Sequence, residues 1–402
     1  MWQQIRSNRI RSLVLVAAMG AVLFLIGYFL GLYFLDNAIG GLLIALVLWL
    51  IMSLMAYFQG DSILLSVAGA KKIKRDDHPR LFNIVEEMKI ASGLSNMPDI
   101  YIIDDPAPNA FATGRNPDKA AVAVTTGLLS KLNRDELQGV IAHEISHVKN
   151  RDVLLMAMCG VLLGTIVILA WHGSRIMIYS GGGRSRSSSS GGGGGAVIVI
   201  LALVLMILAP IIAQFIYFAI SRKREYLADA SGALYTRYPE GLASALEKIG
   251  ASTQQLKSAN QATAPMYISN PFRKKGRPVA ELTSTHPPIS ERVRILRSMA
   301  GGASFVDYDI AYKKIHQGGG SVIPSAVAAT SGTVGIRAAS EASEAVGEPD
   351  KLARTRETSD LMWKLNQYTT IDCPCGTRLK APAIYKGKTI RCPHCGRGHM
   401  VG

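Results

Sequence analysis

The sequence predicts a mainly α-helical membrane protein with four transmembrane helices, a cytoplasmic α+β domain and a small β domain at the C-terminus. Three observations support this fold class. The 402 residues are 49% hydrophobic with a mean hydropathy of +0.21, which is too apolar for an ordinary soluble protein. Four apolar runs are candidate membrane spans, and basic residues border them. Four of the five cysteines lie within the last 30 residues, a pattern that favours a metal cluster in a reducing compartment over a disulfide framework.

The net charge of +15 fits two classes of partner, nucleic acid and an anionic membrane surface. Basic membrane proteins carry much of their charge as Lys and Arg beside their spans. The apolar runs therefore make the lipid bilayer the expected partner.

Residues 1–60 are predicted to form transmembrane helices 1 and 2. Three arginines and no acid precede an apolar run over about 13–35. Because no small-residue cleavage motif follows this run, we expect an uncleaved span rather than a signal peptide. A second run covers about 39–58, and a basic cluster follows at 71–75. Positive charge before the first span and after the second places both flanks on the cytoplasmic side.

Residues 61–152 are expected to form the first part of the cytoplasmic domain. Short β-rich runs at 99–103 and 120–125 border the segment 109–114, which reads Asn-Ala-Phe-Ala-Thr-Gly. Strands beside an active-site helix often form a peptide-binding edge. A small sheet that only completes the core explains the pattern equally well.

Two histidines four residues apart mark the end of this segment. Positions i and i+4 share one helix face, so His143 and His147 can reach one metal ion. Glu144 lies beside them and can take a proton from water at that ion, which completes the zincin pattern of two zinc ligands and a general base. Asn133 can cap this helix and Glu136 can complete a capping box. The alternative is a pair of ordinary surface histidines.

Residues 153–220 are predicted to form transmembrane helices 3 and 4, from apolar runs over about 153–171 and 196–220. The Gly/Ser-rich segment 181–195 between them is typical of a flexible, solvated loop, and its brief Arg-Ser-Arg fits a loop tip better than a nucleic-acid contact. Basic residues at 222–224 follow the second run, so the loop is placed outside and both ends inside. A buried helical hairpin in a soluble domain is the alternative, against which the run length and the basic exit argue.

Residues 221–300 are expected to complete the domain, and Glu225 lies near their start. The hairpin returns the chain to the face that carries the histidines, so Glu225 can be a third ligand. Water can then fill the fourth position, as a catalytic zinc requires. Asp229 shares its helix face and could accept the hydrogen bond that orients a ligating imidazole. Taken alone, Glu225 would be one more charge on a solvated helix face.

Three segments resemble the HtpX-type integral-membrane metalloproteases, which are gluzincins related to the CAAX prenyl endopeptidases. They are AHEISHVKNRD, SRKREYLADASGALYTRYPEGLASALEKI and STHPPISERVRILRSM. The similarity covers about residues 1–300, including four spans in the expected order. It implies a zinc-dependent endopeptidase of the cytoplasmic (inner) membrane whose site and termini face the cytoplasm. It also implies that Glu144 is the base and that the zinc ligands are His143, His147 and Glu225.

The resemblance further implies a substrate-binding segment, formed by Asn109, Ala110, Phe111 and Ala112. His286 matches the late His-Pro motif of these proteases. Its imidazole could steady the developing oxyanion, or it could cap a Pro-rich turn, and both interpretations stay open. The implied substrates are polypeptides, chiefly misfolded or damaged membrane proteins in a stress response, although nothing in the residues themselves selects a substrate.

Residues 301–368 are predicted to be a flexible linker, because much of this stretch is rich in Gly, Ser, Ala and Thr. Residues 369–402 are predicted to form a zinc ribbon, in which four thiolates bind a structural zinc. The four ligands are Cys373, Cys375, Cys392 and Cys395. One residue, rather than the usual two or more, separates the first pair, and His394 or His399 could substitute for a thiolate.

A redox dithiol pair is the alternative for these cysteines, and the glycine in each knuckle argues against it. The basic surface of the ribbon is interpreted as a solvated face rather than a nucleic-acid site, and the sequence identifies no partner for it. Two other functions remain open. One is a CAAX-like processing peptidase, which four spans disfavour. The other is a membrane-tethered zinc-ribbon binding module in which the protease domain is secondary.

Overall fold

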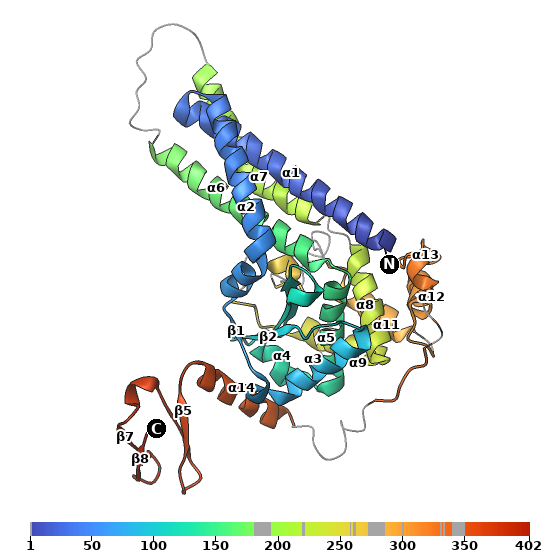
Figure 1. Ribbon diagram of the computed structural model, residues 1–402, viewed down its shortest axis with the longest axis vertical. Helices are drawn as coiled ribbons and strands as arrows, with labels where there is room; N and C mark the ends of the chain where they lie inside the picture. The colour runs from blue at the N-terminus through green and yellow to red at the C-terminus, as the bar shows by residue number, and fades with distance from the viewer. Residues whose placement is uncertain are drawn as a thin grey trace.

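The computed structural model describes residues 2–180, 194–218, 222–257, 259, 263–271, 286–299, 301–329, 332, 334–339 and 350–402. Four long helices extend from one side of a mixed α/β domain, and the C-terminal strands lie on another side (Figure 1). The predicted Gly/Ser-rich loop over 181–195 falls outside the described residues except for its last two positions, which begin a helix.

The four long helices are α1 (Trp2–Leu35), α2 (Ala38–Val67), α6 (Val153–Ser180) and α7 (Gly194–Phe218). Three contain stretches long and apolar enough to cross a membrane, namely Leu13–Leu35, Ala38–Val67 and Val153–Ile176. In α7 the described apolar stretch is the shorter Ile200–Ala213, so the fourth span stays a prediction. Helix α2 also continues past residue 60, the predicted end of the second span.

Helices α1 and α2 cross where both carry small residues. Gly27 and Gly31 on α1 face Gly41 and Ala45 on α2. A methyl group added at Gly41 would collide with the Gly27 carbonyl and lie 2.6 Å from the Gly31 Cα. In lipid, such close backbone contact is a main source of helix association, because the hydrophobic effect no longer drives it.

The mixed domain contains a four-stranded sheet with the order β1-β2-β4-β3. The strands are β1 (Ala70–Lys72), β2 (Asp99–Ile103), β3 (Ala110–Gly114) and β4 (Ala120–Thr125). Strands β2 and β4 are parallel and the other pairs are antiparallel. Both predicted strands occur with the predicted bounds. Strand β3, which holds most of the predicted substrate-binding segment, is an edge strand.

Helices surround this sheet, and α5 (Arg134–Lys149) is buried along most of its length. The predicted capping box is present at its start, with Asn133 and Glu136 exchanging two hydrogen bonds of 2.9 Å. The helices packed near it are α3 (Pro79–Ser92), α4 (Thr126–Lys131), α8 (Arg222–Thr236), α9 (Pro239–Ala251) and α11 (Ile289–Arg297). Their apolar faces share one core with the sheet.

The prediction of a flexible linker over 301–368 is wrong at both ends of that stretch. Helix α12 (Phe305–Ile315) begins with a Ser304–Asp307 capping box and buries Tyr308 in the main core. A short helix, α13 (Ser325–Ala328), follows it, and α14 (Lys351–Leu365) packs against α4. The average composition of the stretch conceals these caps and apolar faces. Residues 340–349 lie outside the described part of the chain.

The C-terminal unit contains two antiparallel hairpins, β5 (Thr369–Asp372) with β6 (Arg378–Ala381), and β7 (Thr389–Arg391) with β8 (Gly398–Met400). Ion pairs to Asp360 attach it to α14, from Arg378 at 2.7 Å and Lys380 at 3.0 Å.

We expect Gly41→Val to destabilise the α1–α2 crossing by about 1–3 kcal/mol, because the added side chain overpacks a backbone contact. The matched control is Gly40→Val, since a Cβ at Gly40 would meet its nearest atom at 3.5 Å. Thermal unfolding of both variants in detergent checks the difference. An equal loss of stability in the two variants would show that the small-residue contact does not hold this hairpin together.

Candidate metal centre

Two adjacent helices, α5 and α8, bring the three predicted metal ligands together. His143 and His147 lie one turn apart on α5, and Glu225 lies in the first turn of α8. The helices lie close together at this level, since a Cβ at Gly232 of α8 would be in van der Waals contact with the His143 backbone nitrogen, at 3.4 Å. All three side chains are buried.

The spacing of the three donor atoms fits a tetrahedral metal ion. The two Nε2 atoms of His143 and His147 are 3.3 Å apart. The Glu225 oxygens lie 3.7 Å from the first and 3.6 Å from the second. Ligands at about 2.0–2.1 Å from zinc stand about 3.3–3.4 Å apart at tetrahedral angles. The donor set therefore suits zinc, with one position left for water or substrate.

Each imidazole is oriented by a buried carboxylate behind it. His143 Nδ1 lies 3.0 Å from Asp229 Oδ1, and His147 Nδ1 lies 3.0 Å from Asp152 Oδ2. When each Nδ1–H donates to its carboxylate, both Nε2 lone pairs point to the common position between the rings. Asp229 thus lies where the sequence predicted a carboxylate that orients a ligand.

Arg292 holds Asp229 in place from α11. Its Nε and Nη2 donate to the two carboxylate oxygens of Asp229 at 2.8 and 2.6 Å, and its Nη1 donates to the Ile268 carbonyl at 3.0 Å. The guanidinium is completely buried. It therefore fixes both the Asp229 carboxylate behind His143 and the chain at Ile268.

Glu144 is 1% exposed and lies beside the donor atoms without binding them. Its Oε1 has no hydrogen-bond partner among the described residues. Burial raises the pKa of Glu144 to about 7, although a hydrogen bond from the Ala112 backbone opposes this shift. A carboxyl group with a pKa near 7 can both accept and return a proton at neutral pH.

Two of the three ligands have a charge that suits a cation, whereas His147 must lose a proton to bind one. Burial alone would lower the pKa of His147, but its hydrogen bond to Asp152 and the charge of Glu225 raise it to about 9. Burial lowers the pKa of His143 to about 4, so this imidazole stays neutral and can act as a donor. Burial alone would raise the pKa of Glu225, but the neighbouring His286 and the two α5 histidines hold it well below its usual range. The site thus presents a carboxylate anion next to a neutral ring.

His286 contacts the metal site through a ligand. Its Nδ1 lies 2.8 Å from Glu225 Oε2, and the residue is buried. This contact places the late His-Pro motif beside the site, and both a catalytic and a structural role fit it. The predicted substrate segment is also close, because the Ala112 backbone lies beside the Glu144 carboxylate.

Two residues of the site were missed by the sequence reasoning. Asp152 lies three residues after the end of α5 and immediately before α6, and a carboxylate five residues after a predicted ligand histidine is a signal that could have been noticed. Arg292 lies within the quoted segment STHPPISERVRILRSM, but one arginine in an amphipathic helix looks like an ordinary surface residue. Only the tertiary contact with Asp229 distinguishes it.

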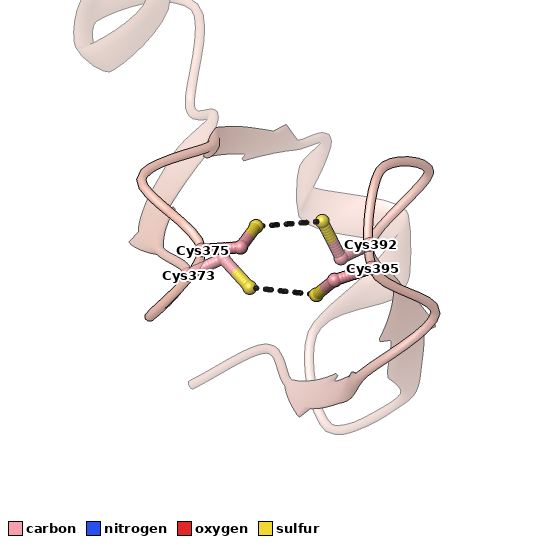
Figure 2. A group of neighbouring side chains, drawn as sticks. All are labelled: Cys373, Cys375, Cys392 and Cys395. Carbon is pink, nitrogen blue, oxygen red and sulfur yellow. Dashed lines mark hydrogen bonds between the residues drawn. The ribbon is translucent and has the colours of Figure 1, made fainter.

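The four C-terminal cysteines also converge, as Figure 2 shows. Cys373 Sγ lies 3.4 Å from Cys395 Sγ, and Cys375 Sγ lies 3.7 Å from Cys392 Sγ. Thiolates at about 2.3 Å from zinc stand about 3.8 Å apart in a tetrahedron, so this group also fits the ion. Of the two histidines that the sequence offered as substitute ligands, His399 contacts the cluster, with its Nε2 3.1 Å from Cys373 Sγ.

Two histidines and a glutamate at one point, with a second buried glutamate beside them, define a metallopeptidase of the zincin class attached to apolar helices. Residues 76–300, more than half of the chain, match the model of Peptidase family M48. The chain belongs to this family.

Curated relatives agree with the family assignment. The Protease HtpX homolog of Dictyoglomus turgidum is 46% identical over 298 residues, which cover 74% of this chain and 94% of that protein. The Protease HtpX homolog of Streptococcus gordonii is 40% identical over 299 residues, which cover 74% of this chain and all of that protein. The chain is thus a membrane metalloprotease of the HtpX type.

Among solved structures, the crystal structure of S. mikatae Ste24p matches with a TM-score of 0.40 and 20% identity, over 74% of this chain and 67% of that chain. This likeness is too low to carry an argument. The family match ends at residue 300, so α12, α14 and the cysteine hairpins lie beyond it.

We expect Asp152→Ala to lower the zinc affinity of the α5–α8 site about 10- to 100-fold, because His147 loses the group that orients it. Titration of the purified protein with a competing chelator, followed by zinc analysis, measures this change. Asp99→Ala, which removes a half-exposed surface aspartate, is the control and should bind zinc as the wild type does. Equal affinities in the two variants would argue against an orienting role for Asp152.

Proposed function

We propose that this chain is a zinc-dependent endopeptidase of the cytoplasmic membrane that cleaves membrane proteins at its cytoplasmic face. In this proposal Glu144 is the general base, and the zinc ligands are His143, His147 and Glu225. One observation supports it above all others. Three ligand atoms stand at tetrahedral spacing, and the partnerless Oε1 of a buried glutamate lies beside them.

A zinc ion bound there would polarise the scissile carbonyl and lower the pKa of a water molecule. Glu144 takes one proton from the attacking water while the water oxygen bonds to the carbonyl carbon. The C–N bond then breaks, and Glu144 returns the proton to the leaving amine. Asp229 and Asp152 keep the two imidazoles in the required tautomer throughout. His286, hydrogen-bonded to Glu225, is proposed to support the oxyanion side of the site.

Strand β3 is proposed to bind the substrate backbone. The carbonyl of Asn109, the residue before β3, accepts a hydrogen bond from the Thr125 N–H of β4 at 3.0 Å, so the backbone polar groups of Ala110 and Ala112 point to the outer edge. An extended peptide can pair with this edge, and the position of Ala112 beside Glu144 places its backbone near the base.

The proposed membrane topology is based on the charges at the helix ends. The start of α1, the end of α2, the start of α6 and the end of α7 all lie on the side of the mixed domain (Figure 1). The basic clusters of the sequence occur on this side, which the positive-inside rule assigns to the cytoplasm. By analogy with the HtpX homologues, misfolded or damaged membrane proteins are the proposed substrates.

A second, structural zinc is proposed for the cysteine ribbon. Its four thiolates come from two knuckles. Together they would supply all four ligands of a tetrahedral zinc, which leaves no coordination position for water. The ribbon has a small apolar interior of its own, so a bound ion would supply much of its folding free energy.

We expect Glu144→Gln to retain zinc and lose casein cleavage, because the base is removed while the ligands remain. Glu225→Ala should lose the metal of the α5–α8 site as well as activity. Zinc content and casein cleavage are measured on the same samples, with Glu247→Gln as a control for an exposed glutamate. Cleavage by the Glu144→Gln protein would refute the assigned role of this residue.

We expect two zinc ions per wild-type chain and one in Cys392→Ala, which should still cleave casein. Cys159→Ala is the matched control, because Cys159 lies within α6 among apolar side chains and should leave both ions in place. Elemental analysis of detergent-purified protein gives the count. Two ions in Cys392→Ala would show that these thiolates do not hold a zinc.

A further inference from the structure

A segment of the chain itself lies on the free edge of β3. We call Tyr267–Ser269 the strap. The Ile268 N–H donates to the Ala110 carbonyl at 2.9 Å. The side chain of Asn109 binds the next residue, donating to the Ser269 carbonyl at 2.9 Å and accepting from its N–H at 3.4 Å. The strap therefore runs antiparallel to β3 and is held against its edge by one backbone hydrogen bond and by the Asn109 side chain, in the place where an incoming peptide would lie.

The strap is also tied to the metal site. Arg292 donates to the Ile268 carbonyl at 3.0 Å and binds Asp229, the carboxylate behind His143. Ile268 is 1% exposed, so it fills the space beside these groups rather than resting on the surface. A charged, buried donor aimed at a backbone carbonyl on a substrate-binding edge is a recognition contact for a peptide.

The strap ends before the catalytic glutamate. If the strap continued antiparallel along β3, position 266 would lie opposite Ala112, whose backbone lies beside Glu144. The chain instead forms a single 3₁₀ turn, η3 (Ala264–Met266), and leaves the sheet. Tyr267 stays extended, with φ −69° and ψ 146°, and its ring packs edge-on against Phe111 at 5.1 Å. The strap thus occupies the edge without presenting a peptide bond to the base.

We propose that the strap is a built-in competitor of substrate, which occupies the leaving-group side of the peptide-binding edge and is displaced when a substrate binds. This inference rests on the proposed function. It assigns Asn109, Ala110 and Arg292 two successive partners, first the strap and then the substrate backbone. The resting enzyme is therefore latent, and its apparent substrate affinity is reduced by the fraction of molecules in which the strap is bound.

The first test weakens the strap while keeping the Ile268 carbonyl that binds Arg292. Ile268→Pro removes the N–H that binds Ala110, and the extended Tyr267 tolerates a following proline. The control is Ile268→Val, which keeps the N–H and most of the side chain. With an internally quenched peptide substrate, we expect Ile268→Pro to lower KM about fivefold with kcat unchanged. We expect Ile268→Val to stay within about twofold of the wild type.

The second test does not require a folded proline variant. Zinc-loaded Glu144→Gln protein is saturated with the same peptide, and hydrogen–deuterium exchange of residues 263–271 is measured. Displacement predicts faster exchange at the strap, and unchanged exchange would overturn the proposal. An unchanged or higher KM in a zinc-loaded Ile268→Pro protein would overturn it as well. A wild type without Glu144-dependent cleavage would instead overturn the proposed function, and with it the strap as a competitor.

Discussion

The buried ion pair between Asp229 and Arg292 is the contact on which the rest of the site depends. Both side chains are completely buried, and burial alone would raise the pKa of Asp229. The Arg292 guanidinium more than offsets this cost and holds that pKa below its usual range. Breaking a buried pair of this kind costs about 3–5 kcal/mol, since one charge is left without a partner. Because the same two residues also bind His143 and the Ile268 carbonyl, the proposed metal site, core stability and the proposed peptide-binding edge rely on one set of hydrogen bonds.

Features encoded by local spacing could be predicted from the sequence. The i,i+4 histidines, the Asn133–Glu136 capping box and the two strands all depend on neighbours within one element. Glu225 required the resemblance to a known family, because nothing local distinguishes it from a surface charge. Asp152 was not predicted, since its direction depends on a turn in which Arg151 adopts a φ of +59°. Arg292 and the strap were missed for a related reason, as their partners lie far away in the chain.

Two kinds of contact attach α14 and the C-terminal hairpins to the protease domain, namely exposed ion pairs and a buried apolar face. Lys364 pairs with Asp77 at 2.6 Å, but the lysine is 63% exposed, and such pairs contribute only about 0–1 kcal/mol. Leu361 and Met362 of α14, in contrast, belong to the main core. The apolar face of α14 is therefore what holds the ribbon beside the protease domain, and the ion pairs set its orientation.

The short connection between α5 and α6 joins the candidate metal site directly to a candidate membrane span. Asp152 orients His147, its carbonyl accepts the Met156 N–H at 3.1 Å, and the next residue, Val153, begins a candidate membrane span. Movement of the metal site away from the start of this candidate span would require α6 to unwind. In the proposed function the distance between the site and the bilayer is therefore fixed, and an extended stretch of a membrane protein would be cleaved only where it reaches that distance.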